Sequence, residues 1–142
     1  MIAIDTNILV RLLVDDPGQP EQVYAARTLA QQSGTVHVAT IVLVECVWVL
    51  DSAYHFNKSA LLTALSHLCG NDAFVLQDLE STIKALEYYR EGAADFADYV
   101  ILVQSQRQGL DLHTFDKRLG REPGVRLLET SAQLSSLQSP AC

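Results

Sequence analysis

Residues 1–10 read MIAIDTNILV, and this stretch predicts both the type of fold and the place of a functional site. The run from Ile2 to Ile4 is apolar, as in a short buried strand. The acid Asp5 follows directly, and the chain turns apolar again at Ile8. A carboxylate that is buried without a partner is strongly destabilising. We therefore expect Asp5 to lie at the carboxyl end of the strand and to have a chemical role there.

The whole chain has 142 residues, 49% of them hydrophobic, and a net charge of −7. This length suits one compact domain, expected at residues 1–130, followed by a polar and partly frayed tail at 131–142. The acidic balance argues against a nucleic-acid partner, because such proteins usually present a basic surface. We expect no signal peptide and no membrane helix, since every apolar stretch is short or carries a charge.

Cysteine and histidine usage points to a cytoplasmic protein without zinc. The three cysteines, Cys46, Cys69 and Cys142, are odd in number and widely spaced, which indicates free thiols in a reducing compartment. The four histidines form neither an HxH nor an HExxH pattern, so a zinc site is not predicted.

Apolar periodicity and helix-breaking residues alternate along the chain. We predict strands at 2–4, 36–39, 73–76, 110–114 and 125–128, and helices at about 8–14, 20–32, 41–54, 58–68, 78–91 and 95–109. Strands that alternate with helices predict an α/β fold with a parallel sheet covered on both faces. Ligands of such sheets bind at the carboxyl ends of the strands.

Five acids fall where this fold would bring them to one edge of the sheet: Asp5, Glu45, Asp95, Asp98 and Asp116. Helix N-termini share that edge, so the five carboxylates are expected to converge on it. Simpler roles stay open for three of them, since Asp95 and Asp98 suit a helix N-terminus and Asp116 suits a turn. Glu45 lacks such a role, because nearly every neighbour from Ile41 to Leu50 is apolar.

Clustered carboxylates repel one another unless a cation lies between them. Mg²⁺ and Mn²⁺ prefer hard oxygen ligands and are usually held by a few carboxylates, water and substrate phosphate. Phosphodiester or phosphoryl-group cleavage is the chemistry that such a site predicts.

Four segments, taken in order, resemble the PIN-domain ribonucleases, and most of all the VapC-type toxins of bacterial toxin–antitoxin pairs. They are Asp5-Thr6-Asn7, Glu45 in its apolar helix, Gly92-Ala-Ala-Asp-Phe-Ala-Asp98 and Thr114-Phe-Asp-Lys117. The resemblance implies a three-layer α/β/α sandwich with a central, mainly parallel five-stranded sheet. It also implies an Mg²⁺ or Mn²⁺ site whose metal-binding and catalytic residues are Asp5, Glu45, Asp98 and Asp116.

Neighbours of these acids receive supporting roles under the same resemblance: Asp95, Thr6, Asn7 and Thr114. A threonine hydroxyl there would orient a carboxylate or a metal-bound water. Asn7 either bonds to Asp5 or substrate, or caps the helix that follows. Three basic side chains are candidates for contact with an RNA backbone: Arg11, Lys117 and Arg118.

What the resemblance implies about function is an endoribonuclease that cuts single-stranded regions of RNA, of the tRNA or ribosomal RNA type. Such toxins form homodimers and are neutralised by a cognate antitoxin protein. Bound Mg²⁺ would also answer the charge objection, because it presents a positive centre to the phosphate. The apolar positions Leu12, Leu13 and 61–68 could supply a dimer surface or belong to the core.

Other functions compete with this interpretation. Haloacid-dehalogenase-type phosphatases place Asp-x-Asp after the first strand, but Asn7 stands where the second acid would be. A receiver domain needs an acid pair after that strand, which is absent here. A non-catalytic PIN scaffold that binds RNA or an antitoxin is the remaining alternative.

Overall fold

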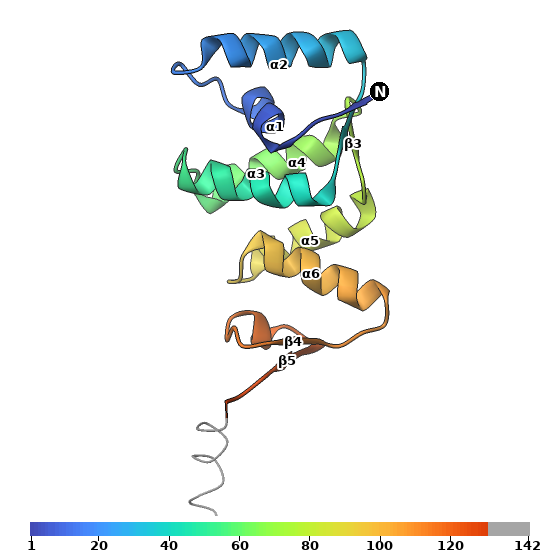
Figure 1. The fold of residues 1–142 in the computed structure, drawn as a ribbon. Helices are drawn as coiled ribbons and strands as arrows, with labels where there is room; N and C mark the ends of the chain where they lie inside the picture. Colours follow the sequence, from blue (N-terminus) through green and yellow to red (C-terminus); the bar gives the residue numbers. More distant parts are fainter. Residues whose placement is uncertain (131–142) are drawn as a thin grey trace, which may run out of the picture.

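Helices and strands alternate along residues 1–130, the part of the chain that the computed structural model describes (Figure 1). The helices are α1 (Thr6–Leu13), α2 (Pro20–Ser33), α3 (Thr40–Ser52), α4 (Lys58–Gly70), α5 (Leu79–Glu91) and α6 (Phe96–Arg107). The strands are β1 (Ile2–Ala3), β2 (Val36–Val38), β3 (Phe74–Leu76), β4 (Leu112–Thr114) and β5 (Val125–Leu127), with a 3₁₀ turn, η1 (Leu119–Arg121), before the last. The expected α/β class is confirmed.

Local capping chemistry explains where the helices begin. Asp5 Oδ1 accepts a hydrogen bond from the Ile8 backbone N–H at 3.2 Å, so α1 starts earlier than the apolar pattern predicts. Asn7 therefore lies inside α1, and its predicted alternative as the helix cap is wrong. Asn57 caps α4, with its side-chain Oδ1 accepting a hydrogen bond from the Ala60 N–H at 2.8 Å. Thr40 is the first residue of α3, whose N-cap is Ala39.

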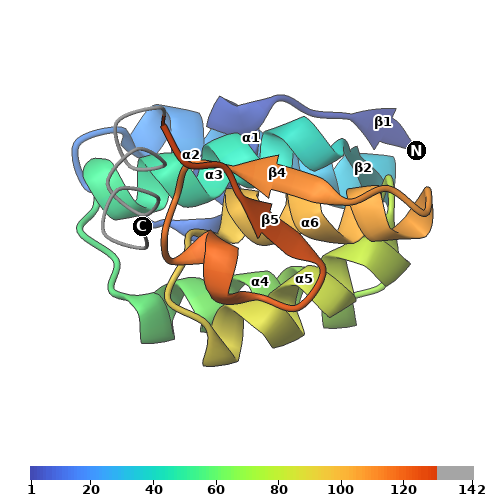
Figure 2. The same ribbon diagram turned by 90° about the horizontal axis from the view of Figure 1, so that it is seen from below.

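The strands form two parallel sheets within residues 1–130, which corrects the predicted single sheet of five. One sheet has the order β1-β2-β3, and the other pairs β4 with β5. Figures 1 and 2 place β4 and β5 beside α6, on the side away from α1 and α2. β1 has only two residues, so its outer edge offers few backbone groups for a further ladder. A three-layer sandwich around one central sheet is accordingly not observed.

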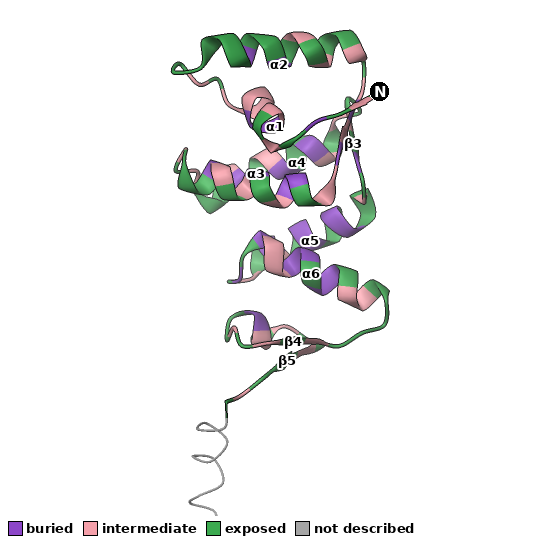
Figure 3. Cartoon of the chain, viewed as in Figure 1, coloured by how far each residue is buried: buried purple, intermediate pink, exposed green. Residues whose placement is uncertain are grey.

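The core is built from β2 and from one face of most helices. Leu9, Val38 and Tyr99 are completely buried in one apolar cluster that extends from α1 to α6. Figure 3 shows that α2 is mostly exposed, whereas α5 and α6 carry many buried residues. The positions left open as a dimer surface belong to this core: Leu12 and Leu13 pack against it, and Leu61, Leu65 and Leu68 are buried.

The cysteines of the described region are free thiols, as predicted. Cys46 is buried and Cys69 is half-buried. Burial raises the pKa of Cys46 to about 12, so this thiol is unreactive at neutral pH. Cys142 and the tail predicted at 131–142 lie outside the described residues. Within residues 1–130, no helix has the length and apolar character needed to cross a membrane.

Candidate active site

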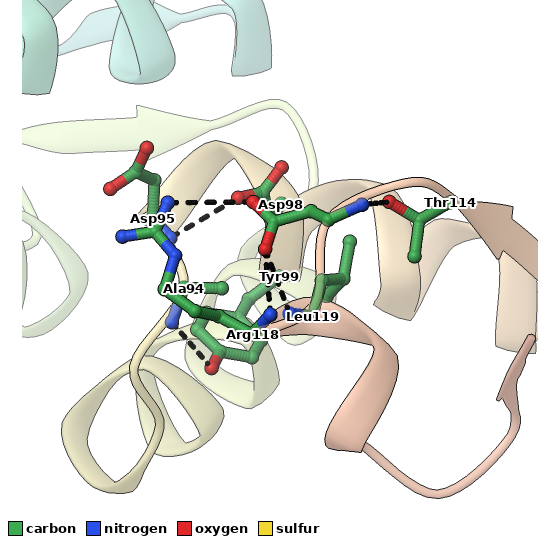
Figure 4. Close-up of polar contacts among 8 residues, drawn as sticks. Ala94, Asp95, Asp98, Tyr99, Thr114, Arg118 and Leu119 are labelled. Atoms are coloured by element: carbon green, nitrogen blue, oxygen red, sulfur yellow. Dashed lines mark hydrogen bonds and ion pairs between the residues drawn. The ribbon is translucent and has the colours of Figure 1, made fainter. Parts of the chain in front are cut away.

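The N-terminus of α6 presents two of the predicted acids. Asp95 is the N-cap residue, and Asp98 lies in the first helical turn. Asp98 Oδ2 accepts a hydrogen bond from the Asp95 backbone N–H at 3.2 Å, which holds the carboxylate in place (Figure 4). Within residues 1–130 its other oxygen, Oδ1, has no hydrogen-bond partner. One oxygen thus serves the fold and the other is free for a ligand.

Asp116 follows β4 and organises the turn that leads to η1. Its Oδ1 accepts hydrogen bonds from the backbone N–H groups of Arg118 (2.8 Å) and Leu119 (3.3 Å). Its own N–H donates to Thr114 Oγ1 at 3.0 Å, so the threonine supports the acid through the backbone. The Arg118 guanidinium lies 3.4 Å from Asp116 Oδ2.

A hollow of about 430 Å³ brings Glu45 of α3 together with Asp95 and Asp98 of α6. Glu45 is exposed and has no hydrogen-bond partner within residues 1–130. The negative charge of Asp116 contributes to the raised pKa of Asp98, so the fourth acid lies near this group. Four of the five acids expected to converge are therefore associated in space.

Asp5 is the exception, because the structure does not place it in that hollow. Asp5 lines a separate hollow of about 330 Å³ between α1 and α2, together with Asn7 and Arg11. Thr6 begins α1 beside it. β1, which leads to Asp5, pairs with β2, whereas β4, which leads to Asp116, pairs with β5.

The three basic candidates differ in their surroundings. Arg11 is largely buried and is bonded to Tyr54 Oη (2.5 Å) and Gln22 Oε1 (2.9 Å), with Asp16 3.6 Å away. An RNA phosphate would have to displace these contacts. Lys117 and Arg118 are exposed beside Asp116 and are the more accessible pair.

The pKa values of Asp98 and Asp116 are shifted in opposite directions. Burial raises the pKa of Asp98, and the charges of Asp95 and Asp116 add to the rise. The Arg118 side chain and the N–H groups at the turn lower the pKa of Asp116. A cation bound beside Asp98 would therefore stabilise the charged form of this carboxylate.

Asp98→Asn is expected to raise thermal stability at neutral pH in EDTA. An acid with a raised folded-state pKa binds its proton more tightly when folded, so its charge destabilises the protein above that pKa. The gain should shrink as the pH falls and vanish below 3.8, the ordinary aspartate value. Thermal unfolding across this pH range measures it. Asp116→Asn, whose wild-type pKa is lowered, should instead reduce stability at neutral pH.

The loop before α6 is held by residues that sequence reasoning did not single out. Lys58 Nζ donates to the Gly92 carbonyl at 2.6 Å, and the Ala94 N–H donates to Tyr99 Oη at 3.1 Å. Tyr99 Oη in turn donates to Glu122 Oε1 at 3.2 Å. These bonds connect the loop that carries Asp95 to the segment that follows η1.

Gly92 makes that arrangement possible. A Cβ atom at this position would collide with the Tyr99 hydroxyl and lie 2.6 Å from its ring carbon Cζ. Only the absence of a side chain lets the loop pass so close to a buried ring. The small residues of Gly92-Ala-Ala94 were the available sequence signal for this close approach.

The donor set at the hollow suits a hard divalent cation. Its carboxylates match the oxygen ligands that Mg²⁺ and Mn²⁺ prefer, and the like charges around Asp98 favour such an ion. In the described part of the chain, no three His, Cys, Asp or Glu side chains meet closely enough to form a complete ion site. Mg²⁺ commonly uses one or two carboxylates together with water and substrate phosphate. Asp98 with Glu45 or Asp116 meets that requirement.

Comparison with known families supplies an independent result. A family model described as the PIN domain matches residues 2–124, a span that includes all five acids. Among curated proteins, nothing matches the chain.

Proposed function

The chain belongs to the PIN-domain family, a nuclease-type fold, and from this premise we propose that it is an Mg²⁺- or Mn²⁺-dependent endoribonuclease that cuts single-stranded RNA. One observation carries the proposal: Glu45, Asp95 and Asp98 share a hollow, and Asp116 acts on Asp98 from the adjoining turn. Acids from three distant parts of the sequence thus meet at one place on the surface.

The acidic side chains of the site would hold the cation, and the basic ones would contact the RNA. Asp98 would hold the cation through Oδ1, because Oδ2 is occupied by the Asp95 N–H. Glu45 and Asp116 would complete the protein's share of the ligands, and Asp5 is a further ligand under the family resemblance. When bound, a divalent cation supplies a more acidic water and neutralises charge on the scissile phosphate. Lys117 and Arg118 would bind neighbouring phosphates.

For the biological role we propose a toxin of the VapC type, acting on tRNA or ribosomal RNA in the cytoplasm as a homodimer and neutralised by an antitoxin. This role follows from the segments that resemble such toxins. A small gene for a DNA-binding protein directly upstream would support it.

Purified protein is expected to cleave a labelled single-stranded RNA in Mg²⁺ or Mn²⁺, and EDTA should abolish the reaction. Added Mg²⁺ in excess over EDTA should restore it, which excludes irreversible damage. Cleavage that continued in EDTA would refute the metal-dependent mechanism.

Glu45→Gln should greatly reduce metal-dependent cleavage and leave the protein folded. Glu45 is exposed and makes no hydrogen bond in the described region, so the fold does not depend on its charge. Initial rates at saturating Mg²⁺ measure the effect, with Glu21→Gln on the exposed face of α2 as the matched control. Full activity of Glu45→Gln would remove Glu45 from the site.

A non-catalytic RNA- or antitoxin-binding module is the second candidate, and one observation favours it. Asp5 lines a different hollow from Glu45, and within residues 1–130 no three His, Cys, Asp or Glu side chains form a complete ion site. Tight RNA binding without any cleavage in Mg²⁺ or Mn²⁺ would support this module. The haloacid-dehalogenase alternative has no such support, because Asn7 still stands at its second acid.

A further inference from the structure

Trp48 is the chain's only tryptophan, and α3 holds it 77% exposed. A large aromatic side chain stabilises the folded state mainly when it is buried, so the exposed Trp48 contributes little to stability. Single exposed apolar residues are common on protein surfaces and need no special explanation. Trp48 differs from those because it lines the hollow that holds the candidate catalytic acids.

Helix geometry directs the indole toward those acids. Glu45 and Trp48 are three residues apart on α3, so they are neighbours on one face of the helix. Long side chains in a helix lean back over the turn on their N-terminal side. This tendency would bring the indole of Trp48 toward the turn that carries Glu45, and both residues line the hollow with Asp95 and Asp98.

We propose that Trp48 is a stacking platform for an unpaired base of the substrate strand, next to the phosphate that is cut. This inference rests on the proposed nuclease function. Because Trp48 lines the same hollow as Glu45 and Asp98, a strand whose phosphate reaches these acids would have an adjacent nucleotide within reach of the indole. Bases of a single strand are free to stack on aromatic rings, whereas paired bases in a duplex are not. Trp48 would thereby help the enzyme to select single-stranded RNA.

A basic peptide is the competing occupant, because Glu45, Asp51, Asp95 and Asp98 make the hollow acidic. We favour the base, since a divalent cation held by these acids would offset that charge and attract a phosphate. The indole then lines the same hollow as the phosphate site, within reach of the base of a bound nucleotide.

The single tryptophan allows a direct test of stacking. Wild-type protein with Ca²⁺ in place of Mg²⁺ is titrated with a short single-stranded oligoadenylate, and the strand is sized afterwards to show that it is intact. Stacking is expected to quench the indole emission, and the same strand annealed to oligouridylate should quench far less. An Arg-rich peptide is the third ligand. Quenching by the peptide and not by the single strand would overturn the inference in favour of a peptide site.

Activity measurements provide the second test. Trp48→Ala should raise KM for single-stranded RNA roughly 5- to 150-fold, the range that follows from loss of one stacked base, with kcat nearly unchanged. Trp48→Phe keeps a ring and should recover most of the affinity. Tyr24→Ala removes another exposed aromatic, which is on α2 and outside the hollow, and should change nothing. Thermal unfolding of the Trp48 variants should match the wild type, because little of the side chain is buried.

These results separate the inference from the function on which it rests. Cleavage that is unaffected by Trp48→Ala, with no quenching by the single strand, would refute the stacking role and leave the nuclease assignment intact. Quenching by the single strand without any cleavage in Mg²⁺ or Mn²⁺ would support the stacking role and refute the nuclease assignment.

Discussion

Asp98→Asn is expected to reduce metal-dependent RNA cleavage by at least about a hundredfold while the protein remains folded. Asparagine can still accept the hydrogen bond from the Asp95 N–H, so the start of α6 is preserved. Only the negative charge is lost. A metal site supplies several kcal/mol of transition-state stabilisation, and every ~1.4 kcal/mol changes a rate tenfold.

Two measurements make this expectation specific. Mn²⁺ should raise the melting temperature of the wild type and have little effect on Asp98→Asn, because binding to the folded state alone stabilises it. Asp98→Ala loses the helix-capping bond as well and should be less stable than Asp98→Asn. Unchanged cleavage by Asp98→Asn would mean that the metal is held elsewhere.

Gly92→Ala is expected to destabilise the protein by about 1–3 kcal/mol, a typical cost of overpacking. The new methyl group would strike Tyr99, whose ring is completely buried and cannot move aside without disturbing the core. Gly92 has a negative φ of −96°, so the cost is steric and does not come from backbone strain. Chemical denaturation measures the free energy of unfolding.

Gly70→Ala is the matched control for this substitution. No atom lies within 4 Å of a Cβ placed there, and its φ is not positive. Alanine should therefore be neutral or stabilise the protein by about 0.4–1 kcal/mol, since it reduces the freedom of the unfolded chain. Equal stability of Gly92→Ala and the wild type would show that the loop can move away from Tyr99.

Local signals predicted the elements well, because each depends on a few adjacent residues. Pro20 begins α2 and Gly34 follows its end, as the sequence indicates. The arrangement of strands depends on contacts between distant segments, and no residue near β4 signals that it pairs with β5 alone. The place of Asp5 relative to the other acids likewise depends on contacts between distant segments.

The exposure of Glu45 could not be predicted from its sequence neighbours. Nearly every neighbour of Glu45 in the sequence is apolar, yet Glu45 is exposed. Leu43, Cys46 and Leu50 of α3 are buried, whereas Ile41 and Trp48 lie exposed with Glu45 on another face. Because apolar residues occupy both faces, the helical period that separates them is hidden in the sequence.

The backbone hydrogen bonds of the aspartates predict which residues would be retained in a relative that no longer cuts RNA. Asp5, Asp98 and Asp116 each accept backbone N–H bonds that a helix or turn requires. Selection for folding alone would keep Asp or Asn at these places in an inactive descendant. Glu45 caps nothing in the described region, so its retention or loss in a relative is the better indicator of whether that relative still cuts RNA.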